Sequence, residues 1–195
     1  MASLVLAACA LMVAAHSVKS PVVSPPRVVI ETTLGEIEIE VDTEHAPATA
    51  ANFLKYVDGG FYTDGQFWRT VKPDNQPDKT VKIEVIQGQA SATRVREFFP
   101  PIALERTSVT KLTHADGVVS MARTEPDTAR DQFFICIGAQ PELDFGGRRN
   151  PDGQGFAAFG RVVRGMDVVR RIQAAPAERQ NLTPPIRIVR ATRAQ

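Results

Sequence analysis

Alternation of apolar and polar residues predicts a protein built mainly of short β-strands. Two alternating runs between residues 27 and 42, separated by Leu34-Gly35, indicate a hairpin whose second strand turns its glutamates to solvent. Further strand patterns cover residues 66–71, 83–88, 117–123, 131–138, 156–163 and 186–191. In the run 83–88, the period of two places Ile83, Val85 and Gln87 on one face.

Two segments have a helical pattern instead. Residues 46–57 have Pro47 in the first turn, an apolar stripe and a Gly59-Gly60 stop, and residues 167–174 have a second stripe. Residues 89–111 have no strong period, and Pro100-Pro101 indicates an irregular surface excursion. Many short strands with two helices among them favour a closed barrel over a βαβ sheet.

The strand around residues 131–138 contains one polar side chain in an otherwise apolar run. A buried amide needs hydrogen-bond partners, so Gln132 is either satisfied inside the protein or faces a cleft where a ligand supplies them. Taken alone, Gln132 favours a structural hydrogen bond inside the protein. Only other motifs of the chain favour a cleft.

Charge and composition narrow the range of functions. The chain of 195 residues has 23 basic and 22 acidic side chains, and its net charge of +1 argues against nucleic acid as a partner. A hydrophobic content of 43% suits one globular domain. The two cysteines, Cys9 and Cys136, and three scattered histidines offer neither a disulfide framework nor a metal cluster. We therefore expect no metal or cofactor.

The N-terminal region has the pattern of an export signal. Residues 4–15 are apolar and uncharged, too few to span a bilayer, which takes about 20 residues, and Ala15-His16-Ser17 follows them. We expect a signal peptide at residues 1–17, a linker at 18–27 and one domain at 28–195, in a periplasmic or secreted protein with no membrane span. No Lys or Arg precedes the apolar run, and lipid attachment at Cys9 is the alternative.

Several short motifs then resemble the cyclophilins in order and spacing. These are Phe67-Trp68-Arg69, Ile86-Gln87-Gly88, Ser120-Met121-Ala122, Gln132-Phe133-Phe134-Ile135, Leu143-Asp144 and Phe159-Gly160. The resemblance covers residues 28–191 and implies a peptidyl-prolyl cis-trans isomerase. It also implies a mainly β fold, a closed eight-stranded antiparallel barrel capped by two α-helices.

The resemblance assigns roles to individual residues. It implies that Arg69 is catalytic and that Gln87 holds it in orientation. It also implies a pocket for the proline ring, with a methionine beneath it, and a surface for the extended peptide. The residues that would bind the substrate are Val85, Met121, Ala122, Arg123, Gln132, Phe134, Leu143 and Phe156. Proline-containing peptides and unfolded protein clients are then the expected partners of a monomer.

Departures from the family pattern keep alternatives open. Glu84 stands where the family usually has a pocket phenylalanine, Glu142 where an aromatic residue is usual, and the segment after Arg69 is longer. The first hypothesis is an isomerase, with retained or reduced activity, that assists folding of exported proteins. The second is a catalytically weak or inactive proline-peptide binding or chaperone module. The third is a purely structural barrel, favoured if Gln132 is fully buried and paired within the protein.

Overall fold

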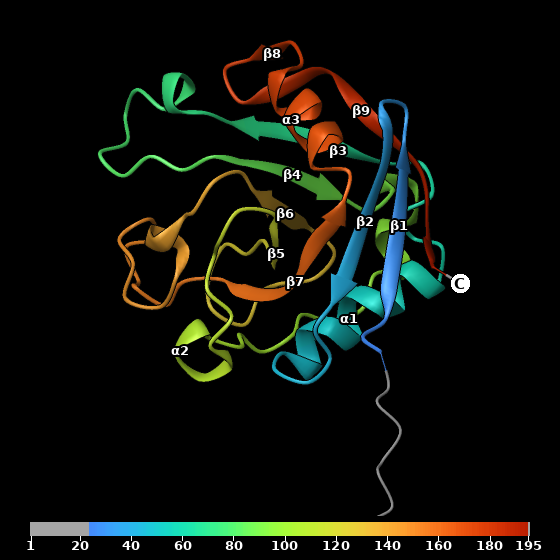
Figure 1. Cartoon of the computed structure of the whole chain (residues 1–195), viewed down its shortest axis with the longest axis horizontal. Helices are drawn as coiled ribbons and strands as arrows, with labels where there is room; N and C mark the ends of the chain where they lie inside the picture. Colours follow the sequence, from blue (N-terminus) through green and yellow to red (C-terminus); the bar gives the residue numbers. More distant parts are fainter. Residues whose placement is uncertain (1–23, 195) are drawn as a thin grey trace, which may run out of the picture.

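The computed structural model describes residues 24–194, and strands dominate it (Figure 1). The predicted signal peptide and most of the predicted linker lie outside the described residues. The strands are β1 (Arg27–Thr32), β2 (Gly35–Val41), β3 (Gly65–Val71), β4 (Val85–Gln89), β5 (Val118–Met121), β6 (Phe133–Cys136), β7 (Ala157–Arg164), β8 (Ala177–Glu178) and β9 (Asn181–Arg193).

Eight of these strands close into an antiparallel barrel, as predicted. They follow the order β1-β2-β7-β5-β6-β4-β3-β9, and β9 pairs back onto β1 from Val28↔Arg193 to Thr32↔Ile188. The two-residue strand β8 pairs only with β9. Closure leaves none of the eight strands with an unpaired edge, which removes the usual site of strand-to-strand aggregation.

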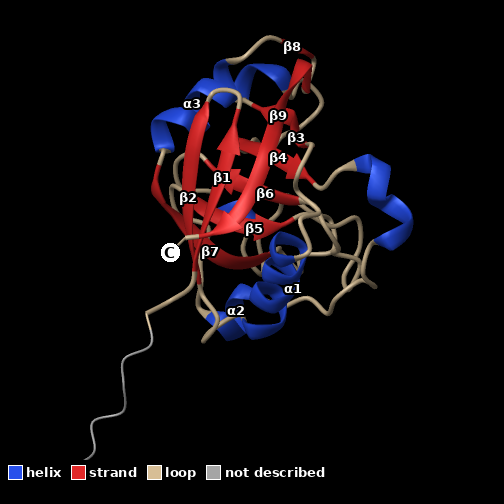
Figure 2. Cartoon of the chain, turned by 90° about the vertical axis from the view of Figure 1, so that its right-hand side faces the viewer, coloured by secondary structure: helices blue, strands red, loops and turns tan. Residues whose placement is uncertain are grey.

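Helices cover the two ends of the barrel (Figure 2). At one end lies α1 (Pro47–Asp58), which buries Phe53, Leu54 and Val57, and at the other lies α3 (Met166–Ala174). Gly165 precedes α3 with φ +94°, and a Cβ there would collide with the carbonyl oxygen of Glu36. The irregular region contains a third helix of four residues, α2 (Thr107–Thr110). Short 3₁₀ turns are η1 (Pro73–Asn75), η2 (Ala92–Glu97) and η3 (Pro141–Leu143).

Alternation along the strands separates two apolar clusters. On β6, Phe133 and Ile135 point into the barrel core, and Phe134 and Cys136 point outward. The outward residues belong to a smaller group that we call the outer cluster: Val71, Ile83, Val85, Phe134, Cys136, Leu143 and Phe156. The barrel core is already filled by the inward side chains, so closing the barrel does not require the outer cluster.

The last strand differs most from its predicted bounds. The pattern predicted a strand at 186–191, but β9 runs from Asn181 to Arg193 and includes Pro184-Pro185. Prolines cannot donate to a ladder, which is why the pair reads as a break in the sequence. In the structure the register with β3 jumps from Phe67↔Ile186 to Arg69↔Asn181, so the prolines lie in an irregularity where no ladder bond is needed.

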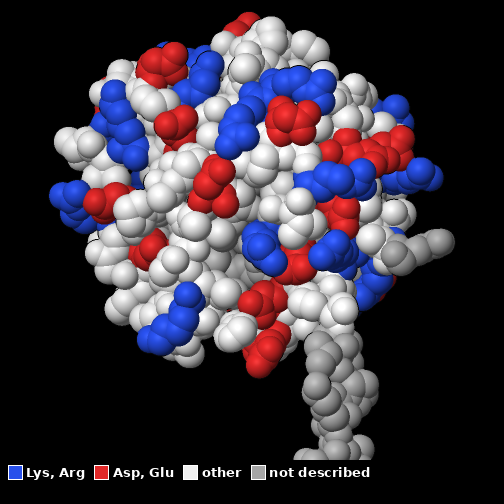
Figure 3. Space-filling view, viewed as in Figure 1, with Lys and Arg blue, Asp and Glu red and all other residues white. Residues whose placement is uncertain are grey.

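Charged side chains of both signs are interspersed over the face seen in Figure 3. On β1, β2 and β7, Glu40 pairs with Arg27 and Arg161, and Glu38 pairs with Arg27 and Arg164. Among residues 24–194, no helix has the length and apolar content needed to cross a bilayer.

The core makes a stability prediction. Phe53 of α1 is fully buried, with its ring centroid 4.9 Å from that of Phe159 and 5.7 Å from that of Phe133. Because Phe53→Ala removes these contacts and leaves a cavity, we expect it to lower the free energy of unfolding by about 3–5 kcal/mol. Urea titration would measure the change. The control Val109→Ala, at a side chain 78% exposed, should stay within about 0.5 kcal/mol. Equal stability of the two variants would contradict the assigned core.

Candidate active site

A small cavity opens on the outer cluster, beside β3, β4 and β6. Its volume is about 280 Å³, a size for one or two side chains of a peptide rather than a large ligand. Its lining residues are Arg69, Lys79, Ile83, Val85, Gln87, Ala122, Arg123, Phe134, Leu143, Arg149, Asn150, Pro151 and Phe156. We call this space the site cavity.

The guanidinium of Arg69 is held by two glutamine side chains. Its Nη1 donates to Gln87 Oε1 at 3.0 Å, and Gln180 Oε1 accepts from Nε at 3.0 Å and from Nη2 at 2.6 Å. Burial lowers the pKa of Arg69, although an arginine stays charged at neutral pH. Amide oxygens fix the orientation of the guanidinium without neutralising its charge.

A second amide contact extends this chain of polar groups across the sheet. Gln87 Nε2 donates to Gln132 Oε1 at 2.7 Å, from β4 to the residue that precedes β6. Gln132 is thus paired within the protein, but its side chain is only half-buried at the surface. The condition that would favour a purely structural barrel, full burial together with pairing, is therefore not met.

Apolar side chains form another part of the cavity wall. The rings of Phe134 and Phe156 meet edge to face, with centroids 5.3 Å apart at 89°. Leu143 is 1% exposed and completes the wall with Val85. This wall offers a preformed apolar surface directly beside a charged donor.

A buried histidine supports the wall from behind. His114 lies parallel to Phe134, with ring centroids 5.9 Å apart and an interplanar angle of 14°. Its Nδ1 lies 2.7 Å from Asp144 Oδ1 and its Nε2 lies 3.0 Å from Ser120 Oγ. Because both ring nitrogens are engaged, the imidazole fixes the position of Phe134.

Most of the residues implied by the sequence gather here. Those that line the site cavity are Arg69, Val85, Gln87, Ala122, Arg123, Phe134, Leu143 and Phe156, and Gln132 lies next to them through Gln87. Met121 differs, because its side chain is 1% exposed within the barrel core and does not line the cavity. It pairs with Phe133 across β5 and β6, and both point inward.

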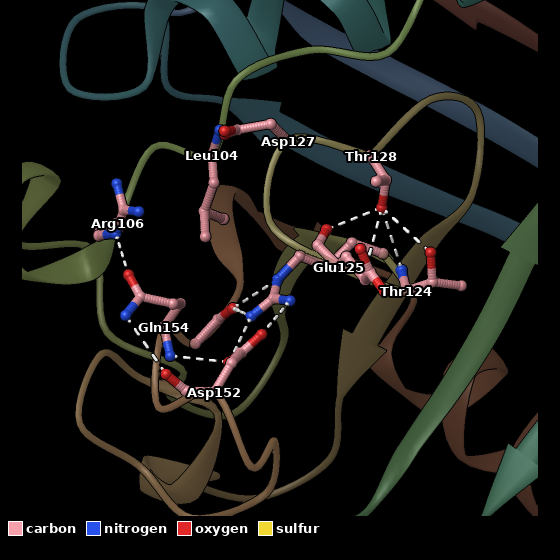
Figure 4. A network of polar contacts seen from close by, with 10 residues as sticks. Leu104, Arg106, Thr124, Glu125, Asp127, Thr128, Asp152 and Gln154 are labelled. Carbon is pink, nitrogen blue, oxygen red and sulfur yellow. Dashed lines mark hydrogen bonds and ion pairs between the residues drawn. The ribbon is translucent and has the colours of Figure 1, made fainter.

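The side chain of Arg123 has a structural partner. It is 1% exposed, its Nη1 donates to Asp152 Oδ2 at 2.7 Å, and its Nη2 donates to Gly155 O at 2.6 Å. Gln154 Nε2 and backbone N–H also bond Asp152, and Arg106 Nε donates to Gln154 Oε1 at 2.6 Å (Figure 4). Arg123 therefore anchors the loop before β7, and a contact between its backbone and a peptide stays a prediction.

The two unusual glutamates do not face the site cavity. Glu84 Oε2 accepts a hydrogen bond from Gln173 Nε2 of α3 at 3.0 Å, and Glu142 pairs with Arg148 on the surface. Ile83, not residue 84, supplies the apolar side chain at this place. The alternation of Ile83, Val85 and Gln87 predicted this shared face, and the structure confirms it.

Several lining residues escaped the sequence analysis. Lys79, Arg149, Asn150 and Pro151 come from irregular segments, and Gln180 precedes β9. No periodicity marks such positions, so only long-range contacts could identify them. Within residues 24–194, no three His, Cys, Asp or Glu side chains are close enough together to hold a metal ion.

Comparison with known proteins gives a consistent result. The family model "Cyclophilin type peptidyl-prolyl cis-trans isomerase/CLD" matches residues 27–193. A structure of a cyclophilin-type isomerase from Cryptosporidium parvum superposes with a TM-score of 0.69 at 21% identity, over 87% of this chain and 99% of that chain.

Curated bacterial relatives are more similar in sequence. A peptidyl-prolyl cis-trans isomerase of Acinetobacter baylyi is 32% identical over 167 residues, which is 85% of this chain and 79% of that protein. Peptidyl-prolyl cis-trans isomerase A of Dickeya dadantii is 35% identical over 152 residues, which is 77% of this chain and 73% of that protein. With a family model that spans the whole barrel, the chain belongs to the cyclophilin-type peptidyl-prolyl cis-trans isomerases.

Proposed function

We propose that the protein isomerises X-Pro bonds of exported proteins during their folding and binds them in the site cavity. Arg69 is the catalytic residue, and Gln87 and Gln180 position it. One observation supports this assignment above all. A charged guanidinium, fixed by neutral amides, lies in the same small cavity as a preformed apolar wall.

The chemistry requires this combination of groups. An X-Pro amide rotates over a barrier of about 18–20 kcal/mol because its nitrogen lone pair is conjugated with the carbonyl. Uncatalysed exchange takes roughly tens of seconds or more. Catalysis needs neither a nucleophile nor a metal, only a site that binds the twisted amide better than either planar form. A donor aimed at the prolyl nitrogen binds its lone pair only when conjugation is lost.

The structure gives Arg69 the properties of such a donor. Its orientation is set before the substrate arrives, so no reorganisation is needed during rotation. Partial burial strengthens its electrostatic effect, because the surrounding dielectric constant is lower than that of water. Phe134, Phe156 and Leu143 then provide an apolar surface for the proline ring. The related Cryptosporidium protein has been solved in the presence of the dipeptide Ala-Pro, which agrees with such an occupant.

The catalytically weak binding module is the second candidate. Its support in the sequence was a possible carboxylate in the pocket, which would pair with Arg69 or repel the ring. Glu84 is bonded to Gln173 and Glu142 to Arg148, and neither lines the site cavity. These contacts favour the isomerase over the binding module.

Export is the part of the proposal that rests on the sequence. The apolar run at residues 4–15 and the small residues after it have the pattern of a signal peptide. The first strand that the structure describes, β1, begins at Arg27, so cleavage after residue 17 would leave every described strand intact. Newly exported chains would supply unfolded X-Pro substrates.

Loss of the guanidinium should remove most of the activity. We expect Arg69→Ala to lower kcat/KM by about 10²–10³-fold in a protease-coupled assay on an X-Pro peptide, because the donor to the twisted amide is gone. Arg161→Ala is the matched control, since Arg161 is exposed on β7 and pairs with Glu40. An Arg69→Ala protein that folds normally and keeps full activity would exclude Arg69 as the catalytic residue.

Gln180 should act through Arg69 rather than by touching the substrate. Removing its amide in Gln180→Ala frees two of the three guanidinium nitrogens, so we expect kcat to fall by roughly tenfold with a small change in KM. The NMR signal of the Arg69 Nε–H group should shift in the same variant. The control variant Asn181→Ala, at the neighbouring position, should change neither kcat nor the Nε–H signal. A normal kcat together with an unshifted Nε–H signal would show that Gln180 has no positioning role.

Export can be tested on the full chain in a bacterial host. We expect a shortened product in the periplasmic fraction or medium, and a cytoplasmic product when residues 1–17 are deleted. Cys9→Ser should not change this distribution, whereas dependence on Cys9 would indicate a lipid anchor. Full-length protein that stays in the cytoplasm would contradict export and leave the isomerase assignment untouched.

A further inference from the structure

Two segments outside the barrel strands form the rim of the site cavity. The β3–β4 segment, residues 72–84, contributes Lys79, and the η3–β7 segment, residues 144–156, contributes Arg149. Arg149 Nη1 donates to the carbonyl oxygen of Val81 at 2.7 Å, so a hydrogen bond joins the two segments.

Each segment is also anchored by buried polar groups. Gln76 is 1% exposed, and its side chain bonds Lys72 O at 2.7 Å and Ile83 O at 2.8 Å, which ties together the two ends of the β3–β4 segment. The buried guanidinium of Arg123, from the segment between β5 and β6, holds the η3–β7 segment through Asp152 Oδ2 and Gly155 O. The backbone of the rim and the Arg149 side chain are therefore held in place before a substrate binds, and Lys79 is exposed at its edge.

The charge on the wall of the site cavity has one sign. Four basic side chains line the site cavity, namely Arg69, Lys79, Arg123 and Arg149, and no Asp or Glu does. Arg123 is paired with Asp152. Among residues 24–194, no carboxylate lies within ion-pairing distance of the remaining three.

The other acids of the two rim segments do not line the site cavity: Asp152 pairs with Arg123, and Asp74 and Asp78 line a neighbouring pocket to which Lys79 also contributes. Three further acids close to the site have other partners. Glu84 accepts from Gln173, Glu142 pairs with Arg148, and Asp144 contacts His114. Burial and the positive charge of Arg69 lower the pKa of Arg149, so the charge of this half-buried guanidinium, which stays protonated, is less well stabilised than in water. A carboxylate would relieve both effects and could accept two N–H groups from the same guanidinium.

We infer that Arg149 and Lys79 form a carboxylate-binding subsite beside the proline pocket, so that the enzyme prefers substrates with Asp or Glu within two residues of the proline. This inference rests on the proposed function, because it takes the site cavity as the place where the X-Pro bond is bound. The anion is a side chain of the substrate peptide itself. The residues that would recognise it lie outside the motifs that led to the site.

The test compares peptides that differ in one charge. N-acetylated, C-amidated X-Pro peptides with Glu or Gln at each position within two residues of proline have no other carboxylate. Exchange measured by NMR avoids the sequence preference of a coupling protease. We expect a Glu/Gln ratio of kcat/KM of roughly three- to tenfold for at least one position. This ratio should fall as salt is raised, because the contact is partly exposed.

Two neighbouring arginines supply the variant and its control. Arg149→Gln should bring the Glu/Gln ratio close to one, and Arg149→Lys should restore part of it. Arg148→Gln should keep the ratio of the wild type, because Arg148 is exposed and pairs with Glu142. Lys79→Gln is a second variant with an intermediate expected ratio, and it keeps the test valid if Arg149→Gln disturbs the rim.

The outcomes separate this inference from the proposed function. A wild-type protein active on Gln and Glu peptides alike would overturn the subsite alone. A ratio that persists in both Arg149→Gln and Lys79→Gln would also overturn it. A folded wild-type protein that accelerates exchange of no peptide in the set would overturn the proposed function instead.

Discussion

The structure depends on a cation fixed by neutral partners. Arg69 is oriented by the amide oxygens of Gln87 and Gln180, and Gln180 is 111 residues away in the sequence. A carboxylate in either place would hold the guanidinium equally well but neutralise it, and the donor would then be weaker toward an amide nitrogen. Glutamine therefore satisfies two requirements at once, a defined geometry and an uncompensated positive charge.

The barrel supplies this geometry because alternate side chains of a strand face the barrel core and the outer surface. In β4, Ile86 packs into the barrel core, whereas Val85 and Gln87 face the site cavity. The register of β3 against β9 brings Asn181 opposite Arg69, which places the preceding Gln180 within reach of the guanidinium. Packing in the core thus fixes the site, so the apolar residues inside the barrel are indirectly required for the polar contacts outside it.

Sequence periodicity predicted most of the strands and two helices, and thus favoured a closed barrel, because alternation and helical stripes are local signals; that the helices cap the barrel was implied by the family resemblance. The roles of Arg69, Gln87 and Phe134 came instead from the resemblance to the cyclophilins, which rests on short motifs in family order. The apparent conflict at Glu84 arose from the family pattern, while simple alternation placed Ile83 on the correct face. Gln180 and Arg149 were missed because their positions follow from irregular segments, whose course is set by distant contacts and not by a repeat.

These irregular segments also determine what the cavity can recognise. The barrel and Arg69 account for binding to the X-Pro amide, which every proline substrate shares, so they cannot distinguish one peptide from another. Discrimination must come from groups that reach the neighbouring residues of the substrate, and the rim around Val81 and Arg149 is the part of the cavity wall with that reach. Because the buried side chains of Gln76 and Arg123 hold the backbone of the rim, little ordering of that backbone is needed when a peptide binds. A preorganised, positively charged rim can therefore convert a small difference in substrate charge into a difference in rate.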